Sequence, residues 1–267
     1  MAAHLNRTAR LAGTLATVLA VAAASAACTD TPDKEYGLSR DGKLSICVVM
    51  PTPMYAQTGA DQQPSGLDVD VLARVTDKIG LEPNYITIGA DWIGTDKPFD
   101  DAKCEIIAGG RIVDAATRDV LDYTSPYLRT HASMLVRADS DVKAPDDLSG
   151  KAVATPGDRP WTGIMSAYAA DWGVTQAPQA DMVAALAALD AGDVPAVLGD
   201  DASLRYLAAQ SAGKYRLVEG VGEPFFPVAF ATSIYIETDL RDDLNETILE
   251  LEETGVLAEV QRTWTGV

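Results

Sequence analysis

The sequence predicts an α/β fold in which largely parallel sheets carry helices on both faces. Short apolar runs bounded by Gly, Pro or Asp alternate with stretches of helical periodicity, which is typical of this fold class. Hydrophobic residues make up 47% of the chain, which is enough for a large buried core. A length of 267 residues allows one large domain or two of ordinary size.

The first 27 residues are predicted to be a secretory signal peptide. Arg7 and Arg10 precede 17 apolar or small residues that run to Ala27, directly before Cys28. This context is similar to a bacterial lipobox, in which the Cys is lipidated, although Ser25 stands where a large aliphatic residue is usual. Cleavage that leaves Cys28 unmodified, or a retained membrane anchor, are the alternatives.

The exported chain begins with a predicted tether, because residues 28–42 are polar and rich in turn formers. Helical spacing of apolar residues follows in 68–80 and 181–192, and each pattern stops at a glycine. Two more helices are expected at 239–253 and from there to about Trp264. The predicted strands are 44–49, 84–88, 105–109, 132–137, 151–155, 195–199, 215–218 and 227–231.

Charge and histidine content exclude several classes of function. The chain has 39 Asp and Glu against 21 Lys and Arg, a net charge of −18, whereas nucleic-acid binding needs clustered cations. Its two histidines are His4, in the predicted leader, and His131, so a zinc site built on paired histidines is excluded. No metal or organic cofactor is implied.

Two cysteines remain once Cys28 is assigned to the anchor. Cys47 and Cys104 each lie in or beside an apolar run that is predicted to be a buried strand. An even number of cysteines in an exported protein favours one disulfide, which would join two strands if they are neighbours. Two buried reduced thiols are the alternative.

Ligands of open α/β sheets bind beyond the carboxyl ends of the strands. The loops at those ends contain Arg, Asp, Trp and Tyr, a mixture that suits a small zwitterion or organic anion. These loops are residues 49–55, 90–92, 109–118, 155–161 and 199–201.

Several motifs carry a family resemblance. They are G-x-D-V-D at Gly66–Asp70, D-x-x-x-P-Y at Asp122–Tyr127, and V-L-x-D followed by five residues and Tyr206. With CEIIAGG and the segment ETGVLAEVQRTWTG in the same order, the chain resembles bacterial extracellular solute-binding proteins of family 3 over nearly all of 43–267. These are receptors of polar amino-acid ABC importers.

The resemblance implies a two-lobed type 2 periplasmic-binding-protein fold that closes on its ligand about two crossover strands. Lobe 1 would take residues 43–127 and 228–267, and lobe 2 residues 132–223. The hinges would lie near 127–132 and 223–228. Paired cysteines at the positions of Cys47 and Cys104 also occur in parts of this family, which supports the disulfide.

The resemblance also suggests binding residues for an amino acid. Trp92 falls at an aromatic platform position, although a core Trp is an equal interpretation. Asp200 falls where the α-ammonium is usually bound. Asp200 could instead cap the following helix, but Asp201 is the more natural cap.

The remaining predicted binding residues match the family less well. Arg118 is the best counterpart of the carboxylate-binding Arg, at a spacing changed by an insertion, and Arg111 stands where the family has a ligand-binding Thr. Gly109 lies in the same loop, and Tyr55 is the aromatic nearest to the first strand. Arg159 could offset Asp158 in the second-lobe turn, where the family usually has Gly followed by Ser or Thr.

Three functions are compatible with these residues. The leading hypothesis is a monomeric, non-enzymatic receptor, exported and lipid-anchored on the outer face of the cell membrane, that hands a small polar solute to an ABC permease. A partner protein of a periplasmic quinoprotein dehydrogenase, or of a sensor, is the second. An enzyme similar to cyclohexadienyl dehydratase is the third, and it would need a carboxyl such as Glu223 as general acid or base.

Overall fold

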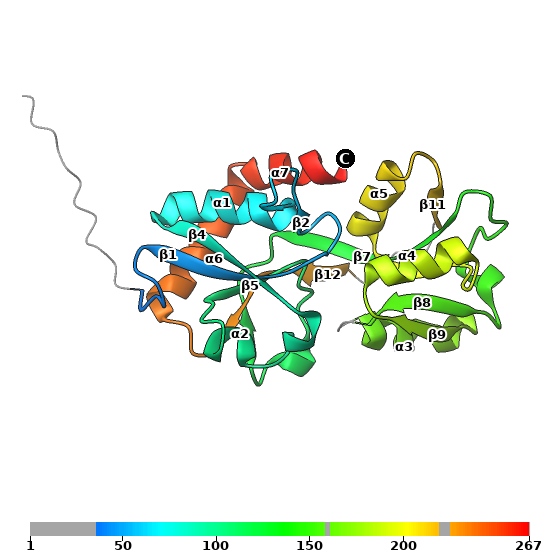
Figure 1. Cartoon of the computed structure of the whole chain (residues 1–267), viewed down its shortest axis with the longest axis horizontal. Helices are drawn as coiled ribbons and strands as arrows, with labels where there is room; N and C mark the ends of the chain where they lie inside the picture. Colours follow the sequence, from blue (N-terminus) through cyan, green and yellow to red (C-terminus); the bar gives the residue numbers. More distant parts are fainter. Residues whose placement is uncertain (1–35, 158–160, 219–224, 267) are drawn as a thin grey trace, which may run out of the picture. The chain divides into compact units, whose positions relative to one another are not determined.

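The computed structural model describes residues 36–157, 161–218 and 225–266. These residues form a two-lobed α/β fold in which each lobe has its own sheet flanked by helices (Figure 1). The sheet of the first lobe has the strand order β4-β1-β5-β13-β6, and that of the second β11-β7-β10-β8-β9. The fold class predicted from the sequence is therefore confirmed.

The first sheet is parallel at its centre. Strand β1 pairs in parallel with both β4 and β5, and all but the first of its residues are buried. Strand β13 pairs antiparallel with both β5 and β6, so β6 is the edge strand opposite β4. The bounds of these strands are β1 Lys43–Val49, β4 Glu82–Ile88, β5 Ile106–Ala108, β6 Leu121–Tyr123 and β13 Ala231–Ser233.

Helix α1 (Leu67–Ile79) packs against the C-terminal helices of the chain, α6 (Thr238–Glu253) and α7 (Val256–Thr265). Its buried face includes Leu67, Leu72 and Val75, and it ends at Gly80, in a left-handed conformation that glycine adopts easily. The indole N–H of Trp264 in α7 donates to Asp70 Oδ2 at 2.7 Å, which fixes the chain's last helix on α1. A four-residue helix, α2 (Lys97–Asp100), and the short strands β2 (Gln57–Thr58) and β3 (Pro64–Ser65) complete this lobe.

The second sheet is parallel across β10, β8 and β9, and antiparallel where β7 meets β10 and β11. Its helices follow the parallel strands: α3 after β8, α4 after β9 and α5 after β10. The bounds are β7 Leu128–Arg137, β8 Ala152–Pro156, β9 Thr175–Gln179, β10 Val197–Asp200, β11 Tyr215–Val218, α3 Trp161–Trp172, α4 Met182–Ala191 and α5 Asp201–Gln210.

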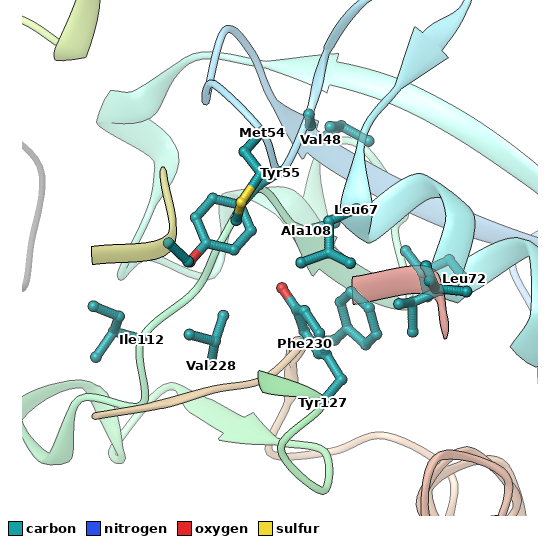
Figure 2. Close-up of a cluster of buried hydrophobic side chains, with 14 of the residues drawn as sticks. Val48, Met54, Tyr55, Leu67, Leu72, Ala108, Ile112, Tyr127, Val228 and Phe230 are labelled. Atoms are coloured by element: carbon teal, nitrogen blue, oxygen red, sulfur yellow. The ribbon is translucent and has the colours of Figure 1, made fainter. Parts of the chain in front are cut away.

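Two antiparallel strands carry the chain between the lobes. Strand β7 leaves the first lobe and enters the second sheet, and β12 (Phe225–Val228), paired with its first half, returns (Figure 1). Beside them, the rings of Tyr127 and Phe230 stack with centroids 4.4 Å apart (Figure 2). This buried pair lies where the chain crosses from lobe to lobe.

The prediction of one strand at 227–231 is wrong. The structure has two strands there, because β12 pairs with β7 and the chain then shifts to pair β13 with β5 of the first sheet. Strand β9 was not expected, since TQAPQ contains Pro178 and little that is β-branched. Proline is tolerated there because β9 is an edge strand. The other predicted strands are confirmed within a few residues.

The predicted disulfide is confirmed. Cys47 in β1 is bonded to Cys104, two residues before the neighbouring strand β5, and both side chains are buried in an apolar cluster with Val49 and Ile88. Among the described residues, no helix is both long enough and apolar enough to cross a membrane.

Candidate ligand-binding site

A cavity of about 180 Å³ lies between the two sheets, at the carboxyl ends of their parallel strands. The first lobe contributes the loops after β1, β4 and β5, and the second lobe those after β8, β9 and β10. This is where an open α/β sheet is expected to bind its ligand. The lining residues are Val49, Met50, Pro51, Thr52, Pro53, Tyr55, Ala90, Gly109, Gly110, Arg111, Pro156, Ala180, Asp181, Met182, Asp200 and Ser203.

Beneath the loop after β5 lies Asp68, which is fully buried at the start of α1. Its Oδ2 accepts the N–H groups of Gly109 and Gly110 at 2.7 and 2.9 Å, and its Oδ1 accepts the hydroxyl of Tyr127. Burial raises the pKa of Asp68, while these hydrogen bonds and the charge of Arg111 act to lower it. The buried carboxyl group therefore holds the glycine loop in place.

Arg111 is the only cation among the lining residues that the structure describes, and it is 6% exposed. Its Nη2 and Nε donate to the carbonyl oxygen of Gly109, at 2.6 and 3.2 Å, which turns the side chain back along its own loop. Gly109 therefore has protein partners for both its N–H and its carbonyl group. Because both groups are already hydrogen-bonded, Gly109 contributes to the cavity by shaping its wall.

Position 110 must be a glycine because the ring of Tyr55 packs against its backbone. Gly110 has φ 66°, and a Cβ atom there would lie 2.4 Å from the ring of Tyr55. The ring therefore packs directly on the glycine backbone, which fixes its orientation at the cavity wall. Figure 2 shows the hydroxyl of Tyr55 directed away from the core residue Leu67.

That hydroxyl reaches the other lobe. It donates to Asp200 Oδ1 at 2.8 Å, and both side chains are buried. A second contact between the lobes joins Gln57 Nε2 to the hydroxyl of Tyr206 in α5, at 3.1 Å. Two polar contacts thus connect the segment after β1 with β10 and α5.

Asp200 is the N-cap of α5, and the prediction that Asp201 would be the cap is wrong. Asp200 Oδ1 accepts the N–H of Ser203 at 2.9 Å, and its Oδ2 accepts the Ser203 hydroxyl. Burial raises the pKa of Asp200, and the bonds from Ser203 and Tyr55 oppose that shift. Asp201 instead pairs with Arg205 and with His131 of β7.

Four of the described residues predicted for binding are brought together here: Tyr55, Gly109, Arg111 and Asp200 all line the cavity. Arg118 and Trp92 do not line it. The Arg118 side chain is 52% exposed and pairs with Asp122 at 3.2 Å. The Trp92 side chain is half-buried against the apolar cluster around the disulfide, with Lys97 Nζ 6.0 Å from its ring centroid.

Cys28, Arg159 and Glu223 lie outside the described residues, as do the predicted signal peptide and part of the tether. Within the described ranges, no group of three or more His, Cys, Asp or Glu side chains is placed to hold a metal ion. The described cavity offers one guanidinium, carboxylates and apolar walls, which suits binding of a small polar organic molecule.

Sequence reasoning missed the contribution of α4. Asp181 caps this helix through Oδ1, which accepts the N–H of Ala184 at 2.8 Å, and Asp181 and Met182 both line the cavity. They were missed because β9 was not recognised as a strand, so the loop that follows it was not included among the loops at the carboxyl ends of strands. An Asp directly before a predicted helix was the available signal.

Comparison with known proteins agrees with this geometry. The family model of the bacterial extracellular solute-binding proteins, family 3, matches residues 44–267. The glutamate-binding protein GluB of Corynebacterium efficiens is 24% identical over 265 residues, which cover 94% of this chain and 89% of that protein. The amino-acid-binding protein AabA of Dichelobacter nodosus is 19% identical over 81% of this chain and 84% of its own.

Among solved structures, an ancestral arginine-binding protein bound to glutamine superimposes with a TM-score of 0.73 at 21% identity, covering 85% of this chain and all of that one. A mutant of the arginine-binding protein ArgBP from T. maritima gives a TM-score of 0.71 at 23% identity, over 85% and 96% of the two chains. At these identities the structural similarity establishes the fold.

Proposed function

The chain belongs to family 3 of the bacterial extracellular solute-binding proteins, and we propose that it binds an amino acid or related organic ion for a membrane importer. The observation that carries this proposal is the cavity between the lobes, where Arg111 and Asp200 face one space from opposite sheets. The two groups suit the two ends of an amino acid, because a guanidinium binds a carboxylate and a carboxylate accepts from an ammonium group.

We assign the carboxylate-binding role to Arg111. Its guanidinium is buried at the cavity wall, whereas the Arg118 side chain is half-exposed and paired with Asp122. We assign to Asp200 the role of binding the ligand's ammonium group. The ammonium group would donate to a carboxylate that already accepts hydrogen bonds from Tyr55 and Ser203. Met50, Pro53 and Met182 would cover the apolar part of the ligand.

Lobe closure is proposed to accompany binding. The hinge would be formed by the two crossover strands, β7 and β12. Lobe 1 would comprise residues 43–127 and 228–267, and lobe 2 residues 132–223. Ligand bound between Arg111 and Asp200 would contact both lobes and so favour the closed state.

The cellular setting follows from the N-terminal sequence and the family. We propose export by the segment 1–27, acylation at Cys28, and delivery of the ligand as a monomer to an ABC permease on the outer face of the membrane. We propose binding without turnover, which is supported by GluB and AabA, both of which are named as binding proteins.

A thermal-shift screen tests the proposal. The protein would be residues 29–267, which contain the whole compact unit Glu35–Val267, and the panel would hold amino acids, amines, organic acids and osmolytes. A ligand at about 100 times its Kd adds about 2.7 kcal/mol of stability, enough to raise Tm by a few degrees. We expect a clear shift with an amino acid. A flat panel on folded protein would overturn the proposal and favour a partner-protein role.

A further inference from the structure

The charges around the cavity are unbalanced. Two carboxylates line it, Asp181 at the start of α4 and Asp200 at the start of α5, and a third, Asp68, lies beneath the Gly109 loop. The described lining residues offer one guanidinium against them, that of Arg111. The described wall therefore presents more negative than positive charge to a ligand.

Arg111 offsets this excess only in part, because it is one guanidinium against the two lining carboxylates. The charge of Arg111 is close enough to help lower the pKa of Asp68, against the larger effect of burial. An anion entering the cavity would meet the single guanidinium of Arg111, with Asp181 and Asp200 on the opposite wall.

Asp181 differs from Asp200 in how its oxygens are used. Asp200 receives hydrogen bonds on both oxygens, from Tyr55 and Ser203. The cap hydrogen bond of Asp181 uses Oδ1, and the side chain is partly exposed at the cavity wall. Asp181 is consequently placed to receive a donor from the ligand while it still caps α4.

We propose that the ligand carries one more positive than negative charge, as amino acids with a guanidinium or ammonium side chain do, and that Asp181 selects this extra charge. The inference rests on the proposed function, since it concerns the same cavity. The α-carboxylate would bind Arg111, the α-ammonium Asp200, and the side-chain cation Asp181. Acidic amino acids would be rejected because they would bring a second negative charge to Asp181 and Asp200.

Isothermal titration calorimetry with matched ligands tests this assignment. L-Arginine and L-citrulline have nearly the same shape, but only arginine carries the extra charge; L-lysine, L-glutamine and L-glutamate complete the set. On residues 29–267 we expect arginine or lysine to bind at least about tenfold more tightly than citrulline and glutamine, and glutamate to bind weakest. Citrulline, glutamine or glutamate binding as tightly as the cationic ligands would overturn the inference and leave the proposed function standing.

Two substitutions on the same region assign the selectivity to one residue. Asp181→Asn removes the charge and keeps the helix cap, because Asn caps as well as Asp. We expect it to reduce the preference for arginine over citrulline roughly tenfold. Asp193→Asn, at an exposed position just beyond α4, is the matched control and should leave that preference unchanged. An unchanged preference in Asp181→Asn would overturn the role of Asp181. Absence of binding by all five ligands would overturn this inference, whereas the wider thermal-shift panel decides the proposed function.

Discussion

The hydroxyl of Tyr55 donates to Asp200 Oδ1 at 2.8 Å across the space between the lobes. Tyr55 follows the first strand of one sheet, and Asp200 ends a parallel strand of the other. The bond joins the loop after β1 to the first turn of α5 at the wall of the cavity. This hydrogen bond links the two lobes directly at the place where a ligand would bind.

Tyr55→Phe removes this hydrogen bond and leaves the ring in place. We expect the free energy of unfolding to fall by about 1 kcal/mol, the usual contribution of such a bond, with Asp200 still held by Ser203. Urea denaturation of the ligand-free protein measures the change. Tyr235→Phe is the control, because Tyr235 is 86% exposed, and a loss of equal size there would argue against the importance of the Tyr55 contact.

Gly110→Ala tests the packing of Tyr55 on the glycine loop. A Cβ at position 110 would meet the Tyr55 ring at 2.4 Å, so we expect a loss of several kcal/mol of stability or a displaced ring. Gly150→Ala is the matched control, since Gly150 also has positive φ, at 76°, but a Cβ there would have no atom within 4 Å. The control should cost about 1 kcal/mol. Equal losses of stability in the two variants would contradict a close contact at Gly110.

Reduction of the Cys47–Cys104 disulfide should destabilise the protein. The cysteines are 57 residues apart in sequence, and closing such a loop in the unfolded chain corresponds to about 4 kcal/mol of stabilisation. Urea denaturation of residues 29–267 with and without reductant measures the difference, and mass spectrometry confirms the thiol state. An unchanged midpoint in fully reduced protein would show that the bridge does not constrain the unfolded state.

The buried carboxyl of Asp68 predicts a specific dependence on pH. Burial raises its pKa in the folded protein, so folding favours the protonated form: its contribution is complete below the ordinary carboxyl pKa near 3.8 and is lost as the pH rises through the higher folded value. The stability of the wild type relative to Asp68→Asn should therefore fall from about pH 4 upward. Urea denaturation across this range tests the sign, and a difference that rises with pH would contradict it.

Much of the fold was predictable because its signals are local. Apolar runs fixed the positions of β1 and β10, and apolar spacing ending at a glycine fixed those of α1 and α4. Strand β9 was missed since its sequence is polar and contains Pro178, which only an edge position tolerates. The division between β12 and β13 depends on which sheet each segment joins, and that is a tertiary property.

The candidate site was predictable in part for the same reason. Tyr55, Arg111 and Asp200 lie at the ends of strands that the sequence identifies, so the rule for parallel sheets places them together. Arg118 matched a family position only through an altered spacing, and the structure places it on the surface beside Asp122. Asp181 was missed with β9, because its position in the cavity depends on that strand.

Calorimetric titration of variants at Arg111 and Arg118 tests the central claim most directly, namely that a solute binds in the cavity at Arg111. With the amino acid that gives the largest thermal shift, Arg111→Gln should weaken binding by roughly a hundredfold, because a buried partner of the ligand carboxylate is lost. Arg111→Lys, which keeps the charge but not the planar fork, should be intermediate. Arg118→Gln should bind within about twofold of wild type, as expected for an exposed surface charge.

Circular dichroism of each ligand-free variant shows that it is folded before it is titrated. A hundredfold loss confined to Arg111→Gln is the result that this structure predicts. Unchanged affinity in folded Arg111→Gln, or loss of binding in Arg118→Gln, would contradict the assignment of the cavity as the binding site.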